Sequence, residues 1–150
     1  MSENLVQEVL LEEEGYLFND FPLGEEKIDH ILINQNGIFV IKDVVVEKFL
    51  TGKTDDEFLY DYKDLKKKKP FPNPIKANED FCYKLSELLE GNSVYIANVV
   101  CFVNDNCDLI TSDNVFNLEE LDDLINSFDE VYQPEEVYKI VEILQENLNK

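Results

Sequence analysis

The first third of the chain alternates between apolar and polar residues in a way that predicts a helix followed by strands. Residues 3–14 place apolar side chains at helical spacing, which predicts an amphipathic helix that ends at Gly15. Residues 16–21 are predicted to form a strand closed by Pro22. Residues 28–46 then contain two apolar runs around the turn at Asn34, Gln35, Asn36 and Gly37, a pattern typical of a β-hairpin.

The middle of the chain is less regular. Residues 49–62 are acidic and aromatic, and their pattern is ambiguous, although an edge strand is one interpretation. Residues 66–74 contain three prolines close together, which predicts a loop.

The second half alternates helices and strands. Residues 75–89 carry apolar side chains at helical spacing, and residues 94–103 form an apolar run typical of a central strand covered on both faces. Asn117 and Glu120 resemble a capping box before a short helix, and Pro134 is predicted to open the last helix. The whole pattern predicts an α/β fold in which α-helices flank a mixed central β-sheet.

Composition favours one domain over residues 1–150, because 150 residues with 44% hydrophobic content can bury a core. We expect no membrane span, since no apolar run approaches the roughly 20 residues that a bilayer requires. Cys82, Cys101 and Cys107 form no metal-binding or disulfide pattern, and the N-terminus lacks a signal-peptide pattern. These features predict a cytoplasmic protein.

Charge is the second strong signal of the sequence. The chain has 33 acidic and 13 basic residues, a formal net charge of −20, and every basic residue is a lysine. Arginine is the side chain best suited to phosphate and guanine, and a strongly negative field repels a polyanion. We therefore expect no binding to free nucleic acid, although Lys63 and the lysines at 66–69 offer one local basic segment. An AT-rich genome would also explain the missing arginines, but it would not explain the acidic excess.

Several strings, in order along the chain, match the motifs of one known family. Ser2 to Val6 resembles the opening motif of that family, and Ile28-Asp29-His30 and Asn36 to Ile41 resemble its two most diagnostic strings. Asn73-Pro74-Ile75-Lys76 resembles a later motif, with Ala77 where the family has glutamine, and Val99 to Phe102 resembles its late buried strand. In these strings the chain resembles the NERD (nuclease-related) domain of the PD-(D/E)xK superfamily, and the resemblance implies a restriction-endonuclease-like fold.

The same resemblance assigns Asp29 to the family's first metal-binding carboxylate. The second carboxylate and the lysine of the motif stand two positions apart on the next strand, so that both face Asp29 and a shared metal. This chain has Lys42 and Val44 at those positions, while Glu3 is a possible remnant of the family's glutamate on the first helix. We therefore expect no catalytic residue and no metal ligand, with Asp29 the only candidate ligand.

Lys42 is expected to pair with Asp29 and to place its ammonium where the metal would lie. The open alternative is a Mg²⁺-dependent nuclease with a relocated site, built from Asp43, Glu47 or Lys48, although strand alternation points Asp43 away from Asp29. The single histidine, His30, has no partner pattern for catalysis, so we predict a packed, hydrogen-bonded role for it.

The remaining hypothesis is binding through acidic surface. Most acidic clusters, including residues 12–14, are expected to be solvated faces. Two of the clusters are predicted to contact a partner. The first consists of Asp55, Asp56 and Glu57, and the second consists of Glu119, Glu120, Asp122 and Asp123. The favoured function is an inactive, nuclease-like module that binds or inhibits a basic protein, for instance a nucleic-acid enzyme, by mimicking nucleic acid. A structural or self-associating accessory domain is the other alternative, and the sequence leaves the oligomeric state open.

Overall fold

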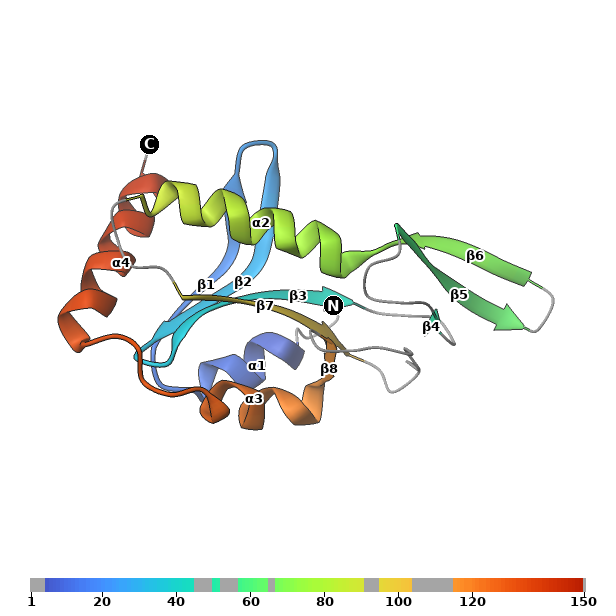
Figure 1. The fold of residues 1–150 in the computed structure, drawn as a ribbon, viewed down its shortest axis with the longest axis horizontal. Coiled ribbons are helices and arrows are strands. Elements are labelled where there is room, and N and C mark those ends of the chain that lie inside the picture. The colour runs from blue at the N-terminus through green and yellow to red at the C-terminus, as the bar shows by residue number, and fades with distance from the viewer. Residues whose placement is uncertain are drawn as a thin grey trace.

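The molecule consists of a mixed β-sheet with helices on both faces and a smaller sheet that projects from one end (Figure 1). The computed structural model describes residues 5–44, 50–51, 57–64, 67–90, 95–103 and 115–149, and for 50–51, 59–64, 67–69, 71 and 115–117 it describes the backbone alone. Within these residues, no helix is both long and apolar enough to span a bilayer.

Five strands form the main sheet of the described chain. They are β1 (Tyr16–Leu23), β2 (Glu26–Asn34), β3 (Gly37–Val44), β7 (Ile96–Phe102) and β8 (Val115–Asn117), in the spatial order β1-β2-β3-β7-β8. The pairs β1–β2 and β2–β3 are antiparallel, and the pairs β3–β7 and β7–β8 are parallel. The predicted hairpin is therefore present and the mixed sheet is confirmed.

The helices divide between the two faces of this sheet (Figure 1). They are α1 (Leu5–Leu11), α2 (Pro74–Leu88), the 3₁₀ turn η1 (Leu118–Glu120), α3 (Leu121–Ser127) and α4 (Pro134–Leu148). One core cluster joins α2 and α4 to the sheet through residues such as Ile31, Val40, Leu85 and Ile140. The other joins α1 and α3 to the opposite face through residues such as Leu10, Phe39 and Ile125.

Strand β3 is covered on both faces because its successive side chains enter different cores. Ile38 and Val40 contact the α2 and α4 side, and Phe39 and Ile41 contact the α1 and α3 side. All four side chains are fully buried, so the unbroken apolar run of this strand follows from burial on both faces.

Three local predictions were wrong. The predicted loop at 66–74 contains a strand, β6 (Lys67–Pro72), which pairs with β5 (Phe58–Asp64) beside β4 (Leu50–Thr51) in the smaller sheet. Proline is tolerated there because β6 is an edge strand, where a missing N–H need not break a ladder. For the same reason Pro22 lies inside the edge strand β1 and does not close it.

The third error concerns the start of the short helix. Asn117 belongs to β8 and does not cap the helix, which begins at Leu121 after the 3₁₀ turn, with Glu120 at the N-cap position. Pro134 does open the last helix as predicted, and the capping box occurs there instead, between Gln133 and Glu136.

Candidate functional site

Asp29 and Lys42 lie at the end of the pairing between β2 and β3. This pairing ends at His30 opposite Ile41, so Asp29 and Lys42 come directly after its last pair. By strand alternation, Lys42 and Val44 lie on the face of β3 that α2 covers. The residues at the motif positions are therefore close to one another in the sheet.

The expected ion pair between Asp29 and Lys42 is not among the ion pairs of the described residues. The Asp29 carboxylate instead accepts a hydrogen bond of 3.0 Å from the backbone N–H of Asp43. The Lys42 ammonium lies 5.9 Å from the centre of the Phe81 ring on α2, within the range of a cation–π contact. The prediction was wrong because it ignored α2, whose aromatic side chain holds the lysine.

Val44 is a core residue, with only 3% of its surface exposed. At this position the nuclease motif carries its lysine, which must reach a metal-bound water. A hydrocarbon at a buried position provides no group that can take or donate a proton. Val44 therefore contributes to the packing of the core and offers no group for catalysis.

His30 and Asp43 form a buried contact on the opposite face. His30 is 1% exposed, and its Nδ1 and Nε2 atoms lie 2.7 Å from Asn19 Oδ1 and 2.7 Å from Asp43 Oδ2. The expectation of a packed, hydrogen-bonded histidine is confirmed. Asp43 faces away from the Asp29 side chain, as strand alternation predicts, and its contact with His30 ties β3 to β2.

Two asparagines that sequence reasoning missed attach α2 to the sheet. The Asn78 side-chain amide donates to the Val40 carbonyl at 2.9 Å and to Asn98 Oδ1 at 2.7 Å, while the Asn98 amide donates to the Ile75 carbonyl at 3.0 Å. Asn73 caps the helix by accepting a 3.0 Å hydrogen bond from the Ile75 N–H. A polar Asn98 inside an apolar strand was the signal in the sequence that could have pointed to this network.

The other predicted site residues are dispersed. Ala77 is exposed at the start of α2, one position before the buried Asn78. Glu3, Asp55 and Asp56 lie outside the described residues, as do Glu47 and Lys48, while Glu57 is exposed. In the described part of the chain, no three histidine, cysteine or acidic side chains converge closely enough to hold a metal ion.

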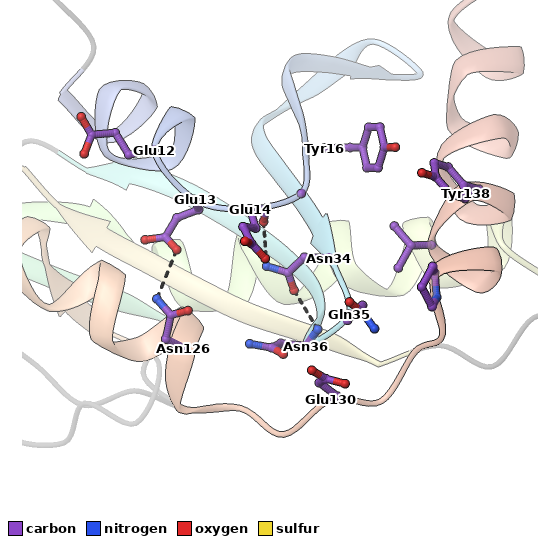
Figure 2. A pocket seen from close by; sticks show the side chains of 13 residues that line it. Glu12, Glu13, Glu14, Tyr16, Asn34, Gln35, Asn36, Asn126, Glu130 and Tyr138 are labelled. Carbon is purple, nitrogen blue, oxygen red and sulfur yellow. Dashed lines mark hydrogen bonds between the residues drawn. The ribbon is translucent and has the colours of Figure 1, made fainter.

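The acidic cluster on α3, by contrast, is part of a larger surface. Glu119, Glu120, Asp122 and Asp123 are all exposed at the start of α3. Asn126 donates a hydrogen bond of 3.2 Å to Glu13 from the segment after α1 (Figure 2). The same amide donates to Asp122 at 3.1 Å, so Asp122 lies beside Glu13. We name the surface made by Glu8, Glu12, Glu13 and Glu119–Asp123 the α1–α3 acidic face.

A hollow of about 420 Å³ lies in the α1–α3 acidic face, with Glu8, Glu12, Glu13 and Asp122 among its lining residues. Sequence analysis treated residues 12–14 as a solvated cluster and could not place them next to Asp122, because 108 positions separate Asp122 from Glu14 in the chain. The structure thus joins one predicted binding cluster to a second acidic segment.

Glu13 is the member of this face with an altered acidity. Burial, followed by the neighbouring Asp122, raises the pKa of the Glu13 carboxyl from 4.5 to about 7, against the opposing hydrogen bond from Asn126. The protonated form of Glu13 is therefore favoured by folding.

A model of the nuclease-related domain family matches residues 1–103. No curated protein and no solved structure matches the chain. The matched segment contains Asp29, Lys42, Val44 and the Asn73–Ala77 motif, whereas α3 and α4 follow it.

The raised pKa of Glu13 predicts a loss of stability as pH rises. A carboxyl whose pKa is higher in the folded than in the unfolded chain stabilises the fold below about 4.5, and this contribution is lost as pH rises through about 7. Glu13→Gln should therefore increase the free energy of unfolding, relative to the natural chain, more at pH 8 than at pH 5. Urea unfolding at both pH values measures this difference.

Glu87→Gln is the control variant, because it removes the same charge from the exposed surface of α2 and so measures the effect of net charge alone. Asp122→Asn should reduce the pH dependence because it removes the neighbouring carboxylate. An identical effect of Glu13→Gln at the two pH values would contradict the assignment.

Proposed function

Because the chain belongs to the nuclease-related domain family but carries Lys42 and Val44 at two motif positions, we propose that the domain has lost nuclease activity and binds a basic protein. The observation that carries this proposal is the surroundings of Asp29. The motif position on the adjoining strand is Lys42, whose ammonium lies over the Phe81 ring, and the next motif position is the buried Val44.

The donor set around Asp29 does not fit a divalent cation. Mg²⁺ sites combine one or two carboxylates with waters and substrate phosphates, and this chain has the ammonium of Lys42, a positive charge, where the motif has its second carboxylate. Asp43 does not supply the missing carboxylate, because its side chain contacts His30 on the other face. This arrangement also argues against a relocated site built from Asp43.

Charge supports a protein partner over nucleic acid. Each phosphate contact requires a cation, and a chain of net charge −20 without arginine offers few of them. The same field attracts a basic protein and steers it toward acidic surface, with a reach of about 8 Å at physiological salt. The α1–α3 acidic face provides such a surface on a rigid sheet, and it would cover a partner's nucleic-acid-binding surface as a mimic of nucleic acid.

The first test concerns chemistry. The purified domain should not cleave duplex DNA, single-stranded DNA or RNA in the presence of Mg²⁺ or Mn²⁺, because among the described residues no group of three acidic, histidine or cysteine side chains could hold the metal, and the motif's lysine position is Val44. Gel assays with labelled substrates measure this, and Asp29→Ala prepared in parallel identifies contaminating nuclease. Metal-dependent cleavage that disappears in Asp29→Ala would contradict the proposal and favour a relocated active site.

The second test concerns binding. A basic protein captured from cells should associate at a rate that falls as salt rises, and neutralising the α3 cluster should slow this association about tenfold or more at low salt. The variant combines Glu119→Gln, Glu120→Gln, Asp122→Asn and Asp123→Asn. Stopped-flow or surface-based kinetics between 0.05 and 0.3 M salt give the rates.

Two controls make the second test specific. An equal loss of charge on exposed acids of α2 and α4, through Glu79→Gln, Asp80→Asn, Glu87→Gln and Glu142→Gln, should slow association much less. Neutralising Asp55, Asp56 and Glu57 examines the other predicted cluster in the same way. Tight DNA binding at 0.2 M salt, or a stable oligomer with no basic partner, would replace this proposal by the nucleic-acid or the accessory-domain alternative respectively.

A further inference from the structure

A cavity of about 530 Å³ opens beside the α1–α3 acidic face (Figure 2). Three segments that are distant in sequence enclose it, namely the connection from α1 to β1, the turn between β2 and β3, and the segment from α3 to α4. The cavity and the smaller hollow of the α1–α3 acidic face share Glu12 and Glu13 in their walls, so the two are adjacent.

The walls of this cavity combine negative charge with exposed aromatic surface. Four carboxylates line it, from Glu12, Glu13, Glu14 and Glu130, and no basic residue does so in the part of the chain that the structure describes. Tyr16 and Tyr138 stand on one side with their ring centres 5.8 Å apart at an interplanar angle of 66° (Figure 2).

Tyr16 and Tyr138 are 38% and 57% exposed, which leaves ring surface available to a guest. The face of an aromatic ring attracts cations independently of any carboxylate. The cavity and the tyrosine pair therefore indicate a cationic guest by two different physical effects.

The shape and the donor groups favour an organic cation over a metal ion. Within the described residues, no three acidic, histidine or cysteine side chains are close enough together to hold a metal. A space of about 530 Å³ accommodates a long side chain with its aliphatic stem, and Val137 and Pro134 give that stem an apolar contact surface. The amides of Asn34 and Gln35 add further hydrogen-bonding groups to the wall.

Arginine matches these walls better than lysine does. Its planar guanidinium carries five donors in a fixed geometry and stacks on aromatic rings, whereas an ammonium is a compact and strongly hydrated charge. The chain itself contains no arginine, so a second copy of this protein cannot supply one. The guest must come from a different molecule.

We propose that this cavity receives an arginine side chain of the basic protein partner and so anchors that partner beside the α1–α3 acidic face. This inference rests on the proposed function, because it assumes a basic protein at that face. Cation–π contact with Tyr138 and hydrogen bonds to Glu14 and Glu130 hold the guanidinium, and the stem lies against Val137.

Nuclear magnetic resonance titration with two small probes tests the inference. Nα-acetyl-arginine amide carries the guanidinium, and Nα-acetyl-citrulline amide is its uncharged counterpart of nearly the same shape. At pH 7.5 and 0.05 M salt, the arginine probe should cause saturable shifts in the Gly15 backbone amide and in the side-chain amides of Asn34, Asn36 and Asn126. The citrulline probe should bind at least tenfold more weakly.

Variants assign the binding to the cavity. Tyr138→Ala should weaken the affinity for the arginine probe about three- to fivefold, and the pair Glu14→Gln with Glu130→Gln about tenfold. The control pair Glu87→Gln with Glu142→Gln removes the same charge from exposed positions outside the cavity and should change the affinity less than twofold.

Each other outcome overturns the inference. Equal losses in the cavity and control pairs would mean diffuse attraction, equal binding of both probes would mean recognition of shape alone, and tighter binding of spermidine would assign the cavity to a free polyamine. Absence of arginine binding, while the basic protein still binds through the α3 cluster, would end this inference and leave the proposed function standing. If no basic protein binds the natural chain at all, the proposed function fails as well.

Discussion

The alternation of side chains along β3 is the constraint on which the rest of the structure depends. This strand is antiparallel to β2 and parallel to β7, and its successive residues enter two different cores. Lys42 and Val44 therefore face α2, while Asp43 faces the opposite side and meets the buried His30. A shift of one residue would exchange these two sets and would break both the contact of Asp43 with His30 and the contact of Lys42 with Phe81. The strand thus decides which side chains stand at the positions of the nuclease motif and what each of them contacts.

The proposed function depends both on where α2 lies on the sheet and on the acidic side chains beside α3. The Asn78 and Asn98 network fixes α2 on the sheet, and α2 in turn presents the Phe81 ring to Lys42. At the other end of the sheet, the turn between β2 and β3 meets the segment after α1, where acidic side chains gather around a cavity and beside α3. The motif positions and the α1–α3 acidic face therefore belong to one frame, and the proposed binding function uses the acidic part of it.

The sequence predicted the elements with strong local signals and missed those that depend on distant partners. The hairpin turn ending at Gly37 and the start of α4 at Pro134 follow from local turn and capping chemistry, and both are present. The strand β6 was missed because only its pairing with β5 makes a proline-rich segment a strand. Likewise, the motif comparison located Asp29, Lys42 and Val44, but the contact of Lys42 with Phe81 depends on where α2 lies. The cavity could not be predicted, since its walls come from three separate segments of the chain.

Binding of Mn²⁺ tests the central claim most directly, because it examines the metal site without depending on a substrate. Electron paramagnetic resonance of a Mn²⁺ titration should show no saturable site at Asp29 in the natural chain, whereas Lys42→Glu, which restores a carboxylate opposite Asp29, should gain one. A single stoichiometric Mn²⁺ bound to the natural chain and lost in Asp29→Ala would contradict the account, since Lys42 would then not exclude the metal.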